Sequence, residues 1–244
     1  MKVLISKKTG IYYYYNDKLK QDFHCKEGFI KKEDLSGDVS TAKSNTNREF
    51  IVFNANKYDL TKKYKRGPQI ITPKDLGYVL ARAGINKNSF IVEAGGGSGA
   101  ASIFFASFVK KVHTYEIKSD HCNIIKKNIE YMNIDNIELF NADLSEKIDD
   151  ESNIDLLFLD MPEPCCVLEN KLEGVKKGAY IVCYVPSISQ IQEITKLISQ
   201  RNDYYLEEIS EVILRHWRVW EKVARPEHRK DIDHTAFLVF IRKV

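Results

Sequence analysis

The chain has 244 residues, of which 43% are hydrophobic and 29% charged, and its formal net charge is +3. These proportions are ordinary for a soluble globular protein. No apolar run reaches the roughly 18 residues that a membrane helix needs, and the N-terminal apolar stretch is too short for a signal peptide. We therefore expect a cytoplasmic protein with one large domain, with or without a small appendage.

The five cysteines, at positions 25, 122, 165, 166 and 183, are odd in number and form no C-x-x-C pair. Reduced thiols are the expected state in the cytosol. Because no cysteines and histidines cluster as zinc ligands would, the sequence predicts no metal site.

Residues 1–63 predict a small N-terminal β-domain. Short strands are expected at residues 2–6, 11–15, 28–30 and 49–53, separated by turn-forming and polar segments. The tyrosine run at 12–15 has two interpretations: stacking on nucleic-acid bases, or the commoner packing inside a small barrel.

From about residue 70, apolar strands alternate with helical patterns, so the second domain is placed at residues 64–244. Strands are expected at 90–93, 111–116, 137–140, 154–159, 178–185, 206–214 and 235–242, and helices at 100–109, 119–132 and 188–201. Alternation of this kind predicts an α/β fold with a Rossmann-like, mostly parallel seven-stranded sheet. The last two strands, joined by a loop at 215–234, should pair antiparallel at one edge, which is the layout of class I methyltransferases.

A glycine-rich loop, EAGGGSGA at residues 93–100, lies between a predicted strand and a predicted helix. Glycines let the backbone turn sharply and approach a ligand closely. Gly95, Gly97 and Ala100 also match the dinucleotide fingerprint G-x-G-x-x-G/A, so the loop alone leaves a nicotinamide cofactor open.

Acidic residues that follow successive strands favour S-adenosylmethionine instead. Glu93 precedes the first glycine, where it can face the cationic methionine end of that cofactor but would repel a pyrophosphate. Glu116 can accept the ribose hydroxyls, and Asp143 can accept a hydrogen bond from the adenine amino group. The alternative is that these acids only cap helices.

Basic residues cluster in two places, Lys57 to Arg66 and Arg215 to Lys230. They predict either contacts with the phosphates of a nucleic acid or an ordinary solvated surface.

Several segments in order resemble the TrmI family of tRNA (adenine-N1)-methyltransferases. They are RGPQIITPKD at 66–75, the glycine loop, TYE at 114–116, DH at 120–121, FLDMPEP at 158–164, YVPSISQ at 184–190, RHW at 215–217, RP at 225–226 and HTAFL at 234–238. The glycine loop is general to methyltransferases, whereas the first segment and the ordered series are specific. The resemblance spans about residues 64–242.

The resemblance implies an enzyme that methylates N1 of a T-loop adenine in tRNA, at position 58 and in some members also 57. It implies a homotetramer. It also implies that Ser98, Gly99, Ala100, Glu116, His121 and Asp143 contact the cofactor and that residues 69–72 cover it, with Asp160 as the catalytic carboxylate. The full set of expected cofactor residues is Gln69, Thr72, Glu93, Gly95, Gly97, Ser98, Gly99, Ala100, Glu116, His121, Asp143 and Asp160.

A carboxylate suits this chemistry because adenine N1 is a weak nucleophile that becomes positively charged on methylation. By accepting a hydrogen bond from the exocyclic amine, Asp160 would stabilise that charge. The buried adenine must be extruded from the folded tRNA. Candidate tRNA-binding residues are Arg66, Tyr184, Arg215, Trp217, Arg225 and His234.

Two positions depart from the family pattern. Cys165 and Cys166 follow Pro164, where the family commonly has a tryptophan, which puts the base-stacking wall in question. Gly96 stands where threonine is usual, so a side-chain hydrogen bond is lost. Three alternatives remain: a methyltransferase for another nucleobase or a protein, a non-catalytic tRNA-binding subunit, and an NAD-dependent dehydrogenase.

Overall fold

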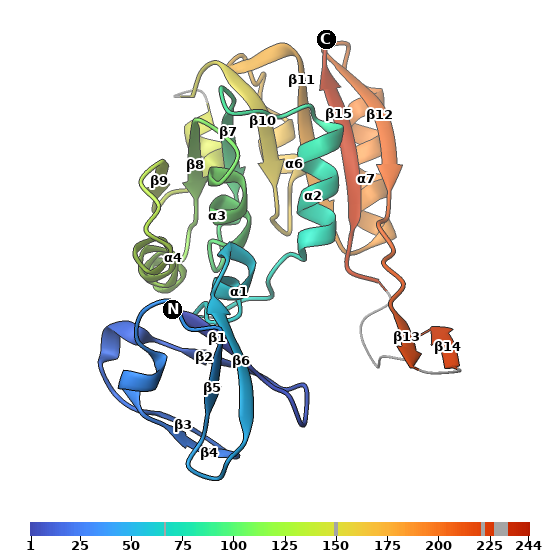
Figure 1. Ribbon diagram of the computed structural model, residues 1–244. Coiled ribbons are helices and arrows are strands. Elements are labelled where there is room, and N and C mark those ends of the chain that lie inside the picture. The colour runs from blue at the N-terminus through green and yellow to red at the C-terminus, as the bar shows by residue number, and fades with distance from the viewer. Residues whose placement is uncertain (66, 149–150, 221–222, 227–233) are drawn as a thin grey trace. The chain divides into compact units, whose positions relative to one another are not determined.

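The computed structural model describes residues 1–65, 67–148, 151–220, 223–226 and 234–244. The chain folds into two compact units, Met1–Tyr64 and Lys65–Val244 (Figure 1). Among the described residues, no helix has the length and apolar character needed to cross a membrane.

The first unit is built from short antiparallel strands. A four-stranded sheet has the order β2-β1-β6-β5, and β3 and β4 pair as a separate hairpin. The bounds are β1 Lys2–Ser6, β2 Tyr12–Tyr15, β3 Phe23–Cys25, β4 Gly28–Ile30, β5 Thr41–Lys43 and β6 Glu49–Asn54, with 3-10 turns at Asp17–Leu19 and Lys32–Leu35 and helix α1 at Lys57–Thr61. Strands β3 and β5 and helix α1 are absent from the elements expected from the sequence.

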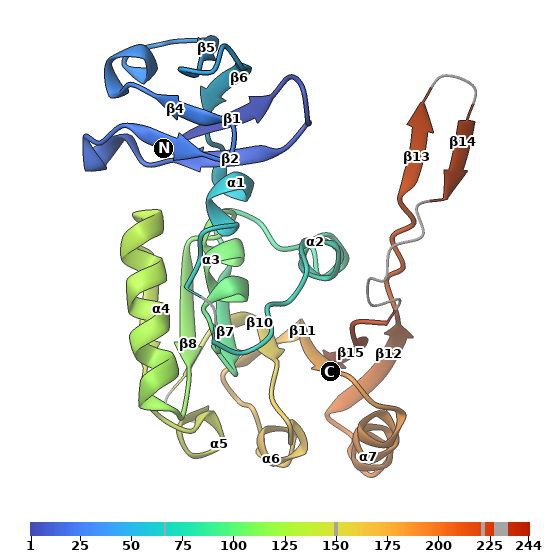
Figure 2. The same cartoon turned by 90° about the horizontal axis from the view of Figure 1, so that it is seen from below.

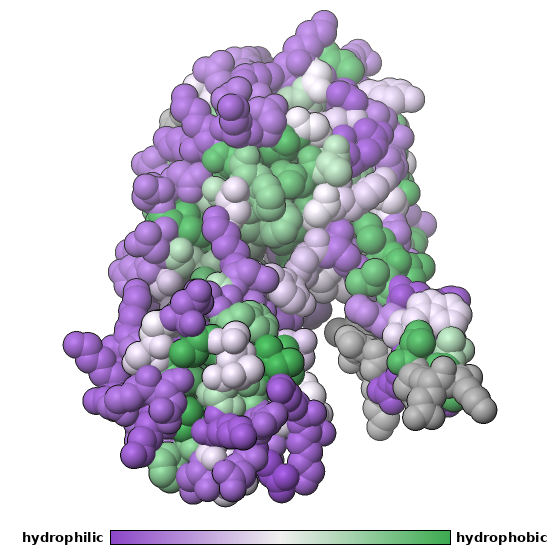
Figure 3. Space-filling view, in the orientation of Figure 1, coloured by the Kyte–Doolittle hydropathy of each residue, from purple (hydrophilic) through white to green (hydrophobic). Residues whose placement is uncertain are grey.

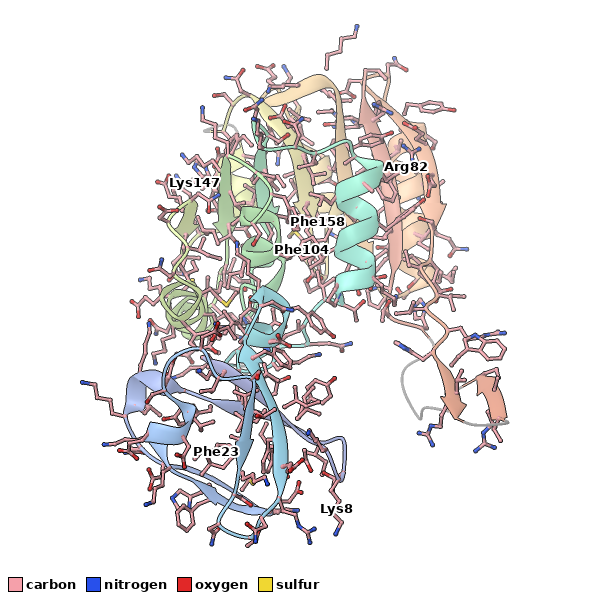
Figure 4. The ribbon with its side chains drawn as sticks, viewed as in Figure 1. Lys8, Phe23, Arg82, Phe104, Lys147 and Phe158 are labelled. Carbon is pink, nitrogen blue, oxygen red and sulfur yellow. The ribbon has the colours of Figure 1, made fainter. Side chains whose placement is uncertain are left out.

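The tyrosine run divides between two sides of this sheet. Successive side chains of a strand point to opposite faces, and Tyr13 and Tyr15 pack in the core with Phe23 and Phe50 (Figure 4). Tyr12 and Tyr14 therefore project from the other face. The expectation that the tyrosines pack inside the domain describes only half of the run.

The second unit is a seven-stranded sheet with the order β12-β15-β11-β10-β7-β8-β9. Its strands are β7 Phe90–Ala94, β8 Lys111–Tyr115, β9 Ile137–Phe140, β10 Ile154–Leu159, β11 Val175–Val185, β12 Tyr204–Ser210 and β15 Phe237–Lys243. Strand β15 runs antiparallel to both of its neighbours, β11 and the edge strand β12, whereas the other pairs are parallel. The predicted antiparallel pairing of the last two sheet strands is confirmed.

Helices cover both faces of this sheet, as Figure 2 shows. Helices α2 and α3 pack with one buried cluster, and α5, α6 and α7 pack with another on the opposite face. The bounds are α2 Pro73–Arg82, α3 Ala100–Ala106, α4 Ser119–Met132, α5 Leu144–Lys147, α6 Cys165–Leu168 and α7 Ile188–Ser199. Phe158 of β10, labelled in Figure 4, lies in the α2–α3 layer. Its ring centroid is 5.4 Å from that of Phe105.

The prediction of a plain loop at 215–234 is wrong for its first half. Strands β13 (Trp217–Trp220) and β14 (Val223–Pro226) pair antiparallel as a separate two-stranded sheet. The short alternation of basic and apolar residues there is a weak strand signal beside the long runs that form the main sheet.

Candidate active site

A cavity of about 380 Å³ opens where the parallel strands β7, β8 and β10 end. Ligands of open α/β sheets bind at this edge. Predicted cofactor residues that line it are Gln69, Glu93, Gly95, Gly97, Ser98, Ala100, Glu116, His121, Asp143 and Asp160. Ile71 of the predicted covering segment 69–72 and Gly96 of the glycine loop also line it. Pro68, Lys118 and Met161 line it too and were not among the predicted residues.

The glycine loop packs directly on the neighbouring strand ends. The amides of Gly95 and Gly96 both donate to the carbonyl oxygen of Tyr115, at 3.0 and 3.1 Å. Gly95 has φ +86°, and a Cβ there would lie 1.7 Å from the carbonyl oxygen of Asp160. Only glycine fits at this position, because any side chain would collide with backbone.

Gly96 shows how the chain accommodates its departure from the family pattern. A Cβ at this position would lie 2.8 Å from both Ile125 Cδ1 and Thr114 Oγ1. The space for a side chain is thus already filled from β8 and α4, so glycine is the residue that fits these neighbours.

Glu93, the last acid before the loop, is almost completely buried. Its burial raises the pKa to about 7, although hydrogen bonds with Ser102 and Thr114 act in the opposite direction. Its Oε2 atom has no hydrogen-bond partner among the described residues. A buried carboxylate oxygen without a partner costs free energy unless a ligand satisfies it.

Asp160 ends β10 beside this loop, and its amide donates to the carbonyl oxygen of Ala94 at 2.9 Å. Desolvation, followed by the nearby charges of Glu93 and Glu116, raises the Asp160 pKa to about 7. Gln190 fixes the segment that follows, because its Nε2 donates to the carbonyl oxygen of Pro162 at 2.9 Å. The carboxyl groups of Glu93 and Asp160 lie in the same pocket, so a charge on one disfavours ionisation of the other.

Glu116 follows β8 and organises the loop from the opposite wall. Its Oε2 accepts the amide of Gly97 at 2.8 Å, and its Oε1 accepts the amide of Lys118 at 2.9 Å. His121 Nδ1 lies 3.4 Å from the same Oε2.

Asp143 combines two roles that the sequence left as alternatives. It lines the cavity, and its Oδ1 also caps α5 by accepting the amide of Ser145 at 2.8 Å. Helix capping is therefore present, and it fixes the carboxylate at the cavity wall.

S-adenosylmethionine fits this set of residues. Its sulfonium and amino groups are cationic, and both Glu93, whose Oε2 has no hydrogen-bond partner among the described residues, and Asp160 line the cavity. A dinucleotide would instead place a pyrophosphate against these acids. The geometry therefore favours the methyl donor over a nicotinamide.

The segment before α2 is hydrogen-bonded to the glycine loop. Ser98 Oγ accepts the amide of Gly67 and donates to the carbonyl oxygen of Pro68, both at 3.3 Å. The buried Asn128 of α4 bonds the carbonyl oxygens of Lys65 and Ser98 at 3.0 and 2.8 Å. Asn128 was not among the residues predicted for the site. The available signal was its position as a polar residue on the apolar face of the helix predicted at 119–132.

Two predicted cofactor residues are not among the lining residues. Gly99 is the N-cap of α3, with φ +77°, and packs on Ile125. Thr72 is the N-cap of α2, and its hydroxyl donates to Asp75 at 2.8 Å.

Asp75 is the centre of a buried polar cluster that the sequence did not predict. The fully buried carboxylate pairs with Lys74 Nζ at 2.7 Å and accepts the hydroxyls of Thr235 at 3.0 Å and Tyr184 at 3.3 Å. Lys74 also donates to the carbonyl oxygen of Val212 at 2.6 Å. The cluster joins α2 to β11 and to both ends of the segment that carries β13 and β14.

The predicted tRNA-binding residues do not gather in the cavity. Arg66 lies outside the described residues, and none of the others lines it within the described chain. Trp217 and Arg225 are on β13 and β14, and Arg215 precedes them. His234 pairs with Glu211 at 2.5 Å and with the carbonyl oxygen of Pro186 at 3.0 Å, so it holds the base of this segment.

The two cysteines that replace the expected aromatic residue lie on α6. Cys165 packs against the core, whereas Cys166 is exposed. None of the five cysteines is paired in a disulfide.

Comparisons with known proteins show the family to which the chain belongs. Residues 59–236 match the family model described as "tRNA methyltransferase complex GCD14 subunit". The tRNA (adenine(57)-N(1)/adenine(58)-N(1))-methyltransferase TrmI of Methanocaldococcus jannaschii is 31% identical, over 88% of this chain and 86% of that protein.

Solved structures share the fold. The tRNA (m1A58) methyltransferase TrmI of Aquifex aeolicus has a TM-score of 0.82 and 25% identity, covering 100% of this chain and 96% of its own. An S-adenosylmethionine-dependent O-methyltransferase of Thermotoga maritima has a TM-score of 0.89 at 23% identity, covering 100% and 92%, and shows the fold alone. The predicted class I methyltransferase fold is confirmed, and the chain belongs to the TrmI family of tRNA (adenine-N1)-methyltransferases.

Proposed function

We propose that this protein transfers the methyl group of S-adenosylmethionine to N1 of an adenine in the T-loop of tRNA, at position 58 or at both 57 and 58. The observation that carries the proposal is that two buried carboxyl groups, those of Glu93 and Asp160, line one cavity at the end of the sheet. The relatives named for this reaction support the choice of substrate.

When bound, the cofactor supplies a methyl group already activated by its positive sulfur. Glu93 and Asp160 would stabilise the cationic end of the cofactor, with Glu93 Oε2 gaining the partner that it lacks. Glu116 would accept hydrogen bonds from the ribose hydroxyls in addition to the one from the Gly97 amide, and Asp143 would accept a hydrogen bond from the adenine amino group.

Asp160 would orient the target base. Its carboxylate would accept a hydrogen bond from the exocyclic amine, which raises electron density at N1 and stabilises the charge that develops there. Binding of a cation beside Asp160 favours the ionised form needed for this role. The protein must also hold N1 in line with the methyl carbon. Holding two reacting groups in the right geometry accelerates their reaction strongly, which is expressed as a large effective molarity.

We also propose the two-domain division of the chain, the cytoplasmic location and the homotetramer. The remaining cofactor contacts, including Thr72 and Gly99, belong to the same proposal. The six tRNA contacts, with Arg66, Arg215 and Arg225 as phosphate-binding candidates, complete it.

The test is incubation of unmodified tRNA with the protein and isotopically labelled S-adenosylmethionine, followed by nucleoside mass spectrometry. Labelled N1-methyladenosine is expected, and it should disappear when both T-loop adenines are replaced by guanine. Label in another nucleoside or in protein would select the alternative methyltransferases. Cofactor binding without any methyl transfer would select the non-catalytic subunit.

A further inference from the structure

The outward residues of the tyrosine run belong to a contiguous surface of the first unit. The strand register aligns Tyr12 and Ile51 on either side of Ile5, and Tyr14 and Phe53 on either side of Val3. Directly paired residues in antiparallel strands share a face. We call Tyr12, Tyr14, Ile51 and Phe53, together with Tyr58 of the adjoining helix α1, the aromatic face.

Four of the five side chains of the aromatic face are exposed, and Tyr14 is half-buried. The exposed fractions are 56% for Tyr12, 54% for Tyr58, 43% for Ile51 and 39% for Phe53. Figure 3 shows apolar residues gathered over β1 and β6, with hydrophilic side chains around them. Single exposed apolar side chains are ordinary, but a contiguous group of them marks a binding surface.

Lysines stand at both ends of the aromatic face. At one end, Lys63 Nζ lies 5.3 Å from the Tyr14 ring centroid, and Lys62 Nζ lies 4.3 Å from that of Tyr58. The acid nearby, Asp59, is engaged in the capping box of α1, where it accepts the amide of Asn56 at 3.0 Å.

At the other end, Lys7 and Lys43 share a single carboxylate. Their Nζ atoms lie 3.1 and 3.3 Å from the two oxygens of Glu49. One acid for two lysines leaves a positive surplus at this end. Lys8 extends from the adjacent turn between β1 and β2 (Figure 4).

Charge is divided unevenly between the two units. Residues 1–64 hold 13 lysines and arginines against 8 aspartates and glutamates, which is +5, whereas the whole chain holds 37 against 34, which is +3. Residues 65–244 therefore carry −2. The positive charge is concentrated in the unit without the cofactor cavity.

We propose that the aromatic face binds unpaired nucleotides of an RNA strand, with bases stacked on Tyr12, Tyr14 and Phe53 and phosphates on the flanking lysines. Aromatic rings between basic side chains are the combination that single-stranded nucleic acid requires, because every base has a face that stacks. A neutral protein surface would match the rings but would not balance the positive surplus of the flanking lysines. The inference rests on the proposed function in taking tRNA as the RNA.

The binding test uses the full chain and unmodified tRNA in fluorescence anisotropy. Tyr12→Leu with Phe53→Leu removes two rings but keeps apolar side chains, and should weaken tRNA binding about tenfold or more. Tyr12→Phe keeps the ring and should bind like the wild type. Tyr205→Leu, at an exposed tyrosine on β12 of the second unit, is the matched control and should also change nothing.

The lysines are tested by the salt dependence of the same equilibrium. Lys62→Gln with Lys63→Gln should reduce the slope of log affinity against log salt by about 1 to 2, since each single-stranded phosphate contact contributes about 0.7. The kcat at saturating tRNA should stay within twofold of the wild type in all variants, and KM for tRNA should rise only in the double leucine and double glutamine variants.

Crosslinking gives a readout that needs no variant. Ultraviolet irradiation of the wild-type protein with tRNA should yield nucleotide-bearing peptides that contain Tyr12, Tyr14 or Phe53. Crosslinks confined to other peptides, or unchanged affinity of the leucine variant, would overturn the inference. Light scattering of the double leucine variant gives a further outcome. If that variant no longer self-associates while its affinity for tRNA is unchanged, the inference is overturned and the aromatic face is a contact between protein chains. If the wild type forms no N1-methyladenosine, the proposed function fails, while the anisotropy result still judges the aromatic face.

Discussion

Gly95 and Asp160 are in such close contact that a Cβ on the glycine would lie 1.7 Å from the carbonyl oxygen of the aspartate. The backbones of the cofactor loop and of the candidate catalytic residue are therefore in direct contact, with no room for a side chain between them. The same contact places the loop, which matches the dinucleotide fingerprint, directly beside Asp160.

Gly95→Ala should abolish measurable S-adenosylmethionine binding and lower the melting temperature strongly. Gly178→Ala is the matched control, because Gly178 has a similar φ of +82° but no atom within 4 Å of the added Cβ. The control should cost only the roughly 1–2 kcal/mol of a left-handed alanine. Calorimetric titration and thermal melts make the comparison, and equal losses in both variants would show that the crowding at Gly95 is unimportant.

The ligand-free protein should lose stability as pH rises from about 4 to about 7. Glu93 and Asp160 have pKa values raised from 4.5 and 3.8 to about 7 in the folded state. Within that window the unfolded chain binds fewer protons, so the free energy of unfolding falls with pH. Glu93→Gln with Asp160→Asn should flatten this dependence in thermal melts, whereas Glu169→Gln, at an exposed carboxyl, should keep it. A wild-type profile in the double variant contradicts the assignment.

Affinity for S-adenosylmethionine should increase as pH rises from 6 to 8. A cation favours ionised carboxylates, so binding should release protons from the cavity. S-adenosylhomocysteine, which lacks the sulfonium charge, should show a weaker dependence. Calorimetry in two buffers of different ionisation enthalpy measures the protons released, and identical pH profiles for the two ligands would argue against this electrostatic role.

Asp160→Asn should lower kcat about 10²–10³-fold, the usual cost of removing one group that stabilises developing charge. The amide keeps the volume and the Gly95 contact, which involves backbone alone. Cofactor binding, measured separately, should persist. Full turnover in the variant would exclude Asp160 as the catalytic carboxylate without changing the substrate assignment.

Asp75→Ala should destabilise the protein by about 3–5 kcal/mol, because it leaves the ammonium group of Lys74 and the hydroxyls of three residues without their buried acceptor. Glu138→Ala removes a partner of Lys111 from an exposed ion pair and should cost at most about 1 kcal/mol. Urea denaturation gives both values, and similar losses would mean that the Asp75 cluster is not a structural centre.

The long apolar strands and the residues that end them could be predicted from the amino-acid sequence. Strand β10 and helix α4 agree with their predicted bounds, because continuous apolar runs and a 3.6-residue period are local signals. Glu93, Glu116, Asp143 and Asp160 were placed correctly at one edge, since the carboxyl ends of neighbouring parallel strands meet there.

What needed the tertiary structure were relationships between distant segments. Asp75 reads as a first-turn acid of a helix, and only folding brings it to Tyr184 and Thr235. The tyrosine run could not be divided between core and surface, because the side that faces the core depends on the strand register with β1 and β6. The amino-acid sequence by itself determined the main strands of the second unit and the acids that follow them, because these are local signals. Packing between elements decided which polar groups are buried together and which rings remain exposed.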